Sequence, residues 1–180
     1  GVITLTGAAI NFTAVVLNLA KDMLPLALAL TMLAGIVLGM GMPTTPAYIM
    51  LAALLIPAVM KLGVPPMAAH MFAFYFACLS AVTPPVALAV YAAASISRCG
   101  LWGAGLQAVK FAAAGFIVPF FFVYSPALLF EGPWLGIVQA IVTGIIGVTA
   151  LAAGLEGYLI RPATWLERGL FIIAAFMLID

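Results

Sequence analysis

The placement of its few charges is what most limits the folds open to this sequence. Only 6% of the 180 residues are charged and 67% are hydrophobic, whereas an ordinary soluble domain carries roughly 25% charged residues. The charged residues are Lys21, Asp22, Lys61, Arg98, Lys110, Glu131, Glu156, Arg161, Glu167, Arg168 and Asp180. Such a composition cannot cover a core with a water-exposed surface, so we predict an all-α, polytopic membrane protein. The net charge of +1 excludes a surface built for nucleic acid.

The uncharged intervals between these residues map the predicted membrane segments. Residues 1–20, 111–130 and 132–155 are each close to the ~20 residues that a helix needs to cross the hydrocarbon core. We predict that each is a single span. The intervals 23–60 and 62–97 are roughly twice as long as one crossing requires. Each has a proline-containing motif near its middle, so neither is predicted to be one continuous helix.

The first interruption, residues 39–46 with the sequence GMGMPTTP, separates apolar segments at 24–38 and 48–60. Proline removes a backbone donor and disfavours helix at the preceding residue, and glycine allows the chain to reverse. Both flanking segments are short for a full crossing. We therefore predict a re-entrant helical hairpin with its tip at 41–46.

The second interruption, residues 80–85 with the sequence SAVTPP, separates segments at 67–79 and 86–97. As a helix each flank is only ~20 Å long, so the two together cross the bilayer once. This pattern predicts a discontinuous transmembrane helix. Non-helical backbone at membrane depth is tolerated only where protein covers it or where it lines a wet cavity, so both interruptions are candidate binding sites.

The two interruptions offer neutral oxygen atoms. Exposed carbonyls and helix C-termini carry partial negative charge and can bind Na⁺, whereas helix N-termini present N–H groups to an anion. Thr44, Thr45, Ser80 and Thr83 add hydroxyl oxygens. No Asp or Glu occurs from residue 23 to residue 97. Neutral oxygens suit a monovalent cation such as Na⁺ better than a divalent ion, and the absence of acids argues against a proton relay.

Charge counting gives two possible topologies. With one hairpin and one broken helix, Lys21 and Lys61 lie on one side of the membrane and the other four basic residues on the opposite, cytoplasmic side. The hairpin then enters from the periplasm. If 62–97 were a second hairpin, all six basic residues would share one side. The short flanks of the second interruption favour the broken helix.

Four segments together resemble a known family, the large DctM-type permease of TRAP (tripartite ATP-independent periplasmic) transporters. They are residues 39–50 (GMGMPTTPAYIM), 55–59 (LIPAV), 69–77 (AHMFAFYFA) and 80–94 (SAVTPPVALAVYAAA). The similarity is to the fused 4TM/12TM branch that works with TAXI-type binding proteins. Residues 1–125 resemble the C-terminal part of the permease transport domain, and 126–180 resemble the additional C-terminal transmembrane or interfacial region, here truncated. We therefore expect a C-terminal fragment of a longer polypeptide.

The resemblance implies a multi-pass protein of a bacterial-type inner membrane, and a Na⁺-coupled symporter. Such a permease imports an organic acid, a C4-dicarboxylate or related carboxylate, from a periplasmic TAXI-type binding protein. It implies an elevator-type transport domain made of two inverted repeats, of which this chain holds the second. The lipid bilayer and the rest of the fused permease, including helices like those of the small subunit, are its other implied partners. Na⁺ is the coupling ion, and no organic cofactor is expected.

The resemblance also carries over a set of site residues. It implies that Na⁺ is held largely by backbone oxygens at Gly41 in the hairpin tip and at Ser80, Thr83 and Val86 around the broken helix. Ser80 stands where the family motif has glycine. Thr45 stands where dicarboxylate permeases commonly have aspartate, so Thr44 and Thr45 are the candidate substrate-binding residues.

Two other classes of function compete with transport. In the first, the chain is a non-transporting membrane scaffold or assembly subunit, and the interruptions are helix kinks that neighbouring hydroxyls relieve. That hypothesis would gain support if residues 41–46 and 80–86 packed dry against each other with every carbonyl hydrogen-bonded. An intramembrane enzyme is not expected, because the apolar segments hold no GxSxG motif, no HExxH motif and no pair of acids.

Overall fold

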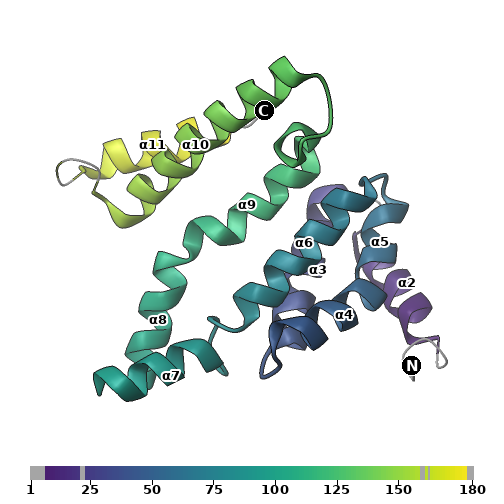
Figure 1. Cartoon of the computed structure of the whole chain (residues 1–180), viewed down its shortest axis with the longest axis horizontal. Coiled ribbons are helices and arrows are strands. Elements are labelled where there is room, and N and C mark those ends of the chain that lie inside the picture. Colours follow the sequence, from purple (N-terminus) through teal and green to yellow (C-terminus); the bar gives the residue numbers. More distant parts are fainter. Residues whose placement is uncertain (1–6, 21–22, 159–160, 162, 178–180) are drawn as a thin grey trace. The chain divides into compact units, whose positions relative to one another are not determined.

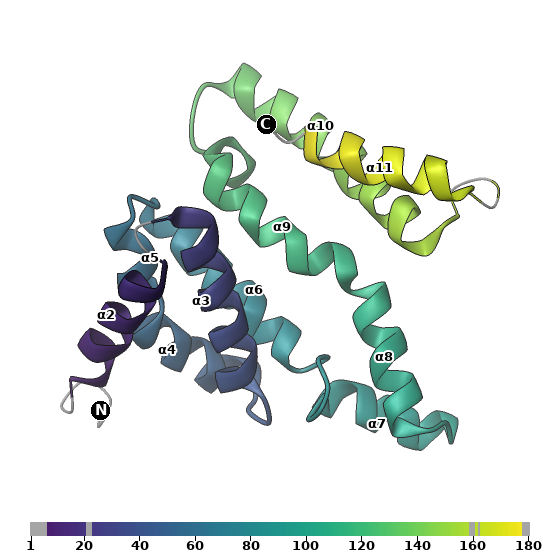
Figure 2. The same cartoon turned by 180° about the vertical axis from the view of Figure 1, so that it is seen from behind.

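The computed structural model describes residues 7–20, 23–158, 161 and 163–177, and the regular elements within these residues are all helices. The chain divides into two compact units, Gly1–Val109 and Lys110–Asp180. Figures 1 and 2 show the course of the chain from opposite sides. The elements are α2 (Ala8–Ala20), α3 (Leu24–Gly39), α4 (Thr44–Leu54), α5 (Ile56–Lys61), α6 (Pro66–Ser80), α7 (Leu88–Ser97), α8 (Leu101–Phe111), α9 (Ala113–Tyr124), the 3-10 helix η1 (Pro126–Leu129), α10 (Trp134–Glu156) and α11 (Trp165–Met177).

The predicted hairpin consists of α3, a turn at residues 40–43, and α4 continued by α5. Its second arm begins at Thr44, earlier than the predicted residue 48. The reason is that Pro46 lies in the first turn of α4, where a helix needs no N–H donor. With α5 the second arm covers Thr44–Lys61, 18 mostly apolar residues, which is long enough to cross a membrane. The prediction that this arm is too short for a crossing is therefore wrong.

The predicted discontinuous helix is also present, as α6, a non-helical break at residues 81–87, and α7. The break ends two residues later than predicted. Ala87 has a φ of +24°, a value that a right-handed helix cannot contain, so α7 starts only at Leu88. In both views the turn between α3 and α4 lies beside the end of α6 (Figures 1 and 2).

Small residues let the helices of the first unit approach closely. A Cβ atom at Gly35 of α3 would lie 3.3 Å from Cβ of Phe76 on α6 and 3.4 Å from Cδ1 of Leu55. Phe76 in turn packs edge-on against Phe72, with ring centroids 4.8 Å apart. These side chains are buried and form the contact between the hairpin and α6.

A polar contact also joins the hairpin to α6. The hydroxyl of Tyr48 on α4 lies 2.7 Å from Nδ1 of His70 on α6. The Tyr48 ring packs edge-on against Phe74, with centroids 5.7 Å apart. The second arm of the hairpin is thereby fixed to the first half of the broken helix.

Three helices among the described residues are long and apolar enough to cross a membrane: Thr44–Lys61, Leu101–Tyr124 and Trp134–Glu156. The last confirms the span predicted at 132–155. For the span predicted at 1–20, the structure gives α2, 13 residues at Ala8–Ala20, and residues 1–6 lie outside the described residues.

The span predicted at 111–130 has wrong boundaries. The helix runs from Leu101 to Tyr124, with Lys110 inside it, and it stops at Ser125 because Pro126 disfavours helix at the preceding residue. Charge counting placed a boundary at Lys110. Lysine is a good helix former and does not end a helix, and here the Nζ of Lys110 lies 3.2 Å from Oε1 of Glu156.

In the second unit, α10 and α11 pack against each other, and Arg168 of α11 binds the C-terminal end of α10. Nε of Arg168 donates to the carbonyl of Gly154 (2.9 Å), and Nη2 donates to that of Leu155 (2.8 Å). These are carbonyls of the last helical turn, which lack partners inside the helix. Gly157 follows with a φ of +76°, and the Arg168 side chain packs against the space where a Cβ would lie. One guanidinium thus satisfies the end of α10.

We predict that Arg168→Gln lowers the thermal stability of the protein, because two hydrogen bonds from a charged donor are lost, each of which contributes roughly 1.5–3 kcal/mol. Arg161→Gln is the matched control. Arg161 pairs with Glu167, but its side chain is 80% exposed, and exposed ion pairs contribute only about 0–1 kcal/mol. Thermal unfolding of the detergent-solubilised protein compares the two. Equal melting temperatures for both variants would contradict this role of Arg168.

Candidate functional site

The turn of the hairpin and the break in the second helix contact each other. A Cβ at Gly39, the last residue of α3, would lie 2.6 Å from Oγ and 2.9 Å from Cβ of Ser80, the last residue of α6. A Cβ at Gly41 would lie 3.5 Å from Cγ1 of Val86. We call this region, residues 39–46 and 80–87, the tip–break junction. Only glycine fits at 39, and the φ of +78° at Gly41 also favours glycine.

Two hydroxyls of the break are bound to helix carbonyls. Oγ of Ser80 donates to the carbonyl of Ala77, and Oγ1 of Thr83 donates to that of Leu79, each at 2.7 Å. A hydroxyl that has donated its hydrogen keeps two lone pairs as an acceptor. Ser80 is fully buried and Thr83 is half-buried. Both side-chain oxygens can therefore serve as cation ligands.

Carbonyl oxygens of the break are held in place by hydrogen bonds. The carbonyl of Ala81 accepts from N–H of Ala89 (3.2 Å), and that of Thr83 accepts from N–H of Ala87 (3.2 Å). The hydroxyl of Tyr91 donates to the carbonyl of Pro85 at 2.7 Å. A carbonyl oxygen has two lone pairs, so each of these oxygens can also accept from a ligand. The break is a fixed loop with neutral acceptors.

Four helix ends meet the tip–break junction. The helices α3 and α6 end there at Gly39 and Ser80, with partial negative charge on their last carbonyls. The helices α4 and α7 begin there. The N–H groups of Thr44 and Thr45 in α4 have no side-chain cap, whereas Pro46 has no N–H. The N–H of Ala89 in α7 donates to the carbonyl of Ala81. Such an arrangement offers a negative potential to a cation and free donors to an anion at adjoining positions.

The structure brings together most of the residues selected from the sequence. Gly41 and Val86 are neighbours across the junction, and Ser80 packs against the helix end just before Gly41. The Thr83 hydroxyl turns back onto its own helix end at Leu79. Thr44 (half-buried) and Thr45 (exposed) are the first two residues of α4. The assignment of these residues to Na⁺ or substrate stays a prediction.

Sequence reasoning missed two residues that shape the tip–break junction, one inside it and one beside it. Gly39 was seen only as part of a turn, although its closeness to Ser80 sets the packing. Tyr91 was not selected, because nothing in the spacing of Pro85 and Tyr91 marks a hydrogen bond across a break. A Gly-x-Gly pair at the end of an apolar helix is the signal that could have identified Gly39 as a close contact.

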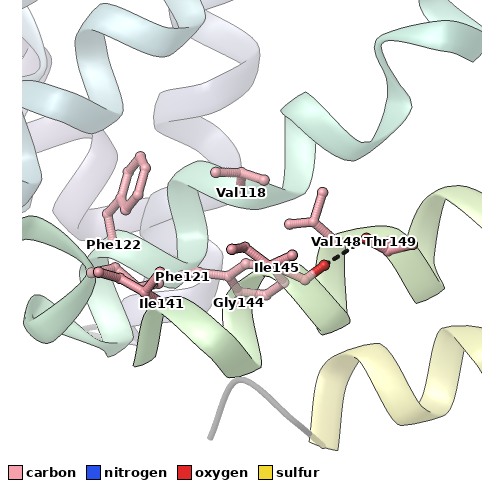
Figure 3. Close-up of a pocket in the computed structure, with 9 residues that line it drawn as sticks. Val118, Phe121, Phe122, Ile141, Gly144, Ile145, Val148 and Thr149 are labelled. Atoms are coloured by element: carbon pink, nitrogen blue, oxygen red, sulfur yellow. Dashed lines mark hydrogen bonds between the residues drawn. The ribbon is translucent and has the colours of Figure 1, made fainter. Parts of the chain in front are cut away.

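The rest of the described structure offers different chemistry. No group of three His, Cys, Asp or Glu residues that could hold a metal lies within the described ranges. The second unit has an apolar pocket of about 380 Å³ between α9, η1 and α10 (Figure 3). At the edge of this pocket, the hydroxyl of Thr149 donates a hydrogen bond to the carbonyl of Ile145. No charged residue lines this pocket, which suits an apolar group and makes it a poor cation site. Its lining residues are Val118, Phe121, Phe122, Leu128, Ile141, Gly144, Ile145, Val148 and Thr149.

Comparison with known proteins gives one family. Residues 1–132 match the family described as "Tripartite ATP-independent periplasmic transporter, DctM component". The match covers the first unit, α9 and η1, and ends before α10. No curated protein and no solved structure matches the chain.

We predict that Gly39→Ala destabilises the tip–break junction, because the added Cβ would overlap Ser80, and overpacking of this kind costs about 1–3 kcal/mol. The loss of stability caused by Gly39→Ala should be smaller in the Ser80→Gly background. It is measured there as the difference between the double variant and Ser80→Gly alone. Thermal unfolding of the four proteins of this double-mutant cycle measures the coupling. Gly103→Ala is the control, because a Cβ there meets nothing within 4 Å. Equal effects of Gly39→Ala in both backgrounds would show that the two residues do not press on each other.

Proposed function

Because the chain belongs to the DctM-component family of tripartite ATP-independent periplasmic transporters, we propose that it forms the C-terminal part of a Na⁺-coupled permease for organic acids. In this proposal the tip–break junction is the transport site. The hairpin α3–α4 and the broken helix α6–α7 form the second of two inverted repeats in an elevator-type transport domain. Membership of a transporter family assigns the chain to transport and gives no support to an enzyme.

The observation that carries the proposal is the contact of the two interrupted elements at Gly39, Gly41, Ser80 and Val86. Helix ends and fixed neutral oxygens converge there, and the sequence places no carboxylate from residue 23 to residue 97. In a site of this kind, several carbonyl and hydroxyl dipoles compensate for the water that a monovalent cation loses on binding. We therefore assign Na⁺, as a transported ion, to Gly41, Ser80, Thr83 and Val86.

An organic anion is proposed to bind beside the cation, at the start of α4. The N–H groups of Thr44 and Thr45, the first two residues of α4, have no side-chain cap, and both residues also carry a hydroxyl. Helix N-termini with free N–H groups favour carboxylates. We propose a C4-dicarboxylate or related carboxylate as the substrate, delivered by a periplasmic TAXI-type binding protein to a permease in the inner membrane.

The scaffold hypothesis receives less support. It would gain if the two segments packed dry with every carbonyl hydrogen-bonded. The carbonyls of Ala81, Thr83 and Pro85 do accept hydrogen bonds. However, Gly41 and Thr45 are exposed, and Thr83, Pro84 and Val86 are only half-buried. A purely structural kink would also not need an uncapped helix start on the facing segment. These features favour a site that accepts ligands.

We predict that Thr83→Ala raises the half-saturating Na⁺ concentration for uptake roughly tenfold, which corresponds to the loss of about 1.4 kcal/mol of cation stabilisation. Thr83→Ser keeps the hydroxyl and should stay near the wild type. The measurement is uptake of radiolabelled succinate and related carboxylates by the complete permease in proteoliposomes, with its binding protein, over a range of Na⁺ concentrations. Unchanged Na⁺ dependence in Thr83→Ala would count against this site.

A further inference from the structure

Helix α8 contacts the break from a segment that the proposed site does not include. Gly105 is the one buried residue of α8. A Cβ at Gly105 would lie 2.9 Å from Cγ of Pro84 and 3.8 Å from its Cβ. Ordinary contacts between carbon atoms are about 3.5–4.0 Å, so the proline ring rests directly on the α8 backbone.

The Pro84 ring cannot move away from a close contact as freely as a flexible side chain can. Its ring closes onto its own backbone nitrogen, so a push on Cγ moves the main chain. Its neighbours are held as well, since Thr83 is bound to Leu79 and Pro85 is bound to Tyr91. A displacement at Pro84 is therefore passed to the carbonyls and hydroxyl of the break.

The hairpin also contacts the break, through two other glycines. Gly39 contacts Ser80 and Gly41 contacts Val86, and both come from the hairpin. Gly105 reaches the middle of the same loop from α8, some twenty residues further along the chain. The break is thus contacted by both the hairpin and α8, with Pro84 as the point of contact for α8.

We propose that Gly105 is a positioning residue for the cation site, and that α8, by seating Pro84, fixes the oxygen geometry of the break. This inference rests on the proposed function, because it assumes that the break binds Na⁺. Gly105 touches neither ion nor substrate and acts only through Pro84. A side chain at position 105 would shift the ligands while leaving their number unchanged.

The test is equilibrium binding of ²²Na⁺ to the purified, complete permease carrying Gly105→Ala. Its matched control is Gly103→Ala on the same helix, where a Cβ meets nothing within 4 Å. We expect Gly105→Ala to raise the half-saturating Na⁺ concentration by roughly three- to tenfold, which corresponds to about 0.6–1.4 kcal/mol of lost binding free energy. Gly103→Ala should bind as the wild type does. Equal binding by the two variants would overturn the inference.

The route through Pro84 is tested by adding Gly105→Ala to Pro84→Ala, which removes the ring carbon that the new Cβ would meet. Gly105→Ala should then change neither Na⁺ affinity nor melting temperature relative to Pro84→Ala alone. A full effect in this background would refute the contact as the cause. Equal melting temperatures of Pro84→Ala with and without Gly105→Ala would show that the contact is relieved even if Na⁺ binding is too weak to measure. Absence of saturable Na⁺ binding in the wild type would overturn the proposed function, whereas normal wild-type binding with an unaffected Gly105→Ala would overturn this inference alone.

Discussion

The close approach of Gly39 to Ser80 is the interaction on which the rest of the structure depends. Both residues end helices inside an apolar region, where unpaired backbone groups are costly. Because neither the glycine nor the small serine keeps the chains apart, the turn of one element lies on the break of the other. The contact covers part of each interruption, and Gly41 and Thr45 stay exposed. Non-helical backbone at membrane depth requires cover by protein or a wet cavity. A larger side chain at position 39 would separate the two interruptions and expose both.

The scarcity of charge then acquires a chemical meaning under the proposed function. With no carboxylate in the two interrupted segments, the attraction for a cation comes from the C-terminal ends of α3 and α6 and from fixed dipoles, and the start of α4 places N–H groups nearby. A bound Na⁺ and a bound carboxylate about 5 Å apart would attract each other by about 3 kcal/mol at an effective dielectric constant of 20. Each ligand would then strengthen the binding of the other by the same factor. Such reciprocal stabilisation is a physical basis for coupled transport.

The helical class, the two interruptions and the span at α10 could be predicted from the sequence, because they follow from apolar length and from proline and glycine placement. Other features could not. Lys110 was placed at a membrane boundary because its partner, Glu156, is far away in the sequence. The start of α4 was placed too late because Pro46 is acceptable in a first helical turn. Gly105 on Pro84 and Tyr91 on Pro85 are tertiary contacts, for which the local pattern holds no signal.

Solvent access at Val86 tests most directly whether Na⁺ binds in the tip–break junction. A cysteine would be introduced as Val86→Cys in a complete permease from which every other cysteine, including Cys78 and Cys99, has been removed, and its labelling by a water-soluble maleimide would be followed in Na⁺ and in K⁺. A cysteine from Ile96→Cys, at a position 86% exposed near the end of α7, provides the control. The account predicts that Na⁺ slows labelling at position 86 in a saturable manner and leaves position 96 unchanged. Equal labelling rates at position 86 in Na⁺ and K⁺ would contradict it.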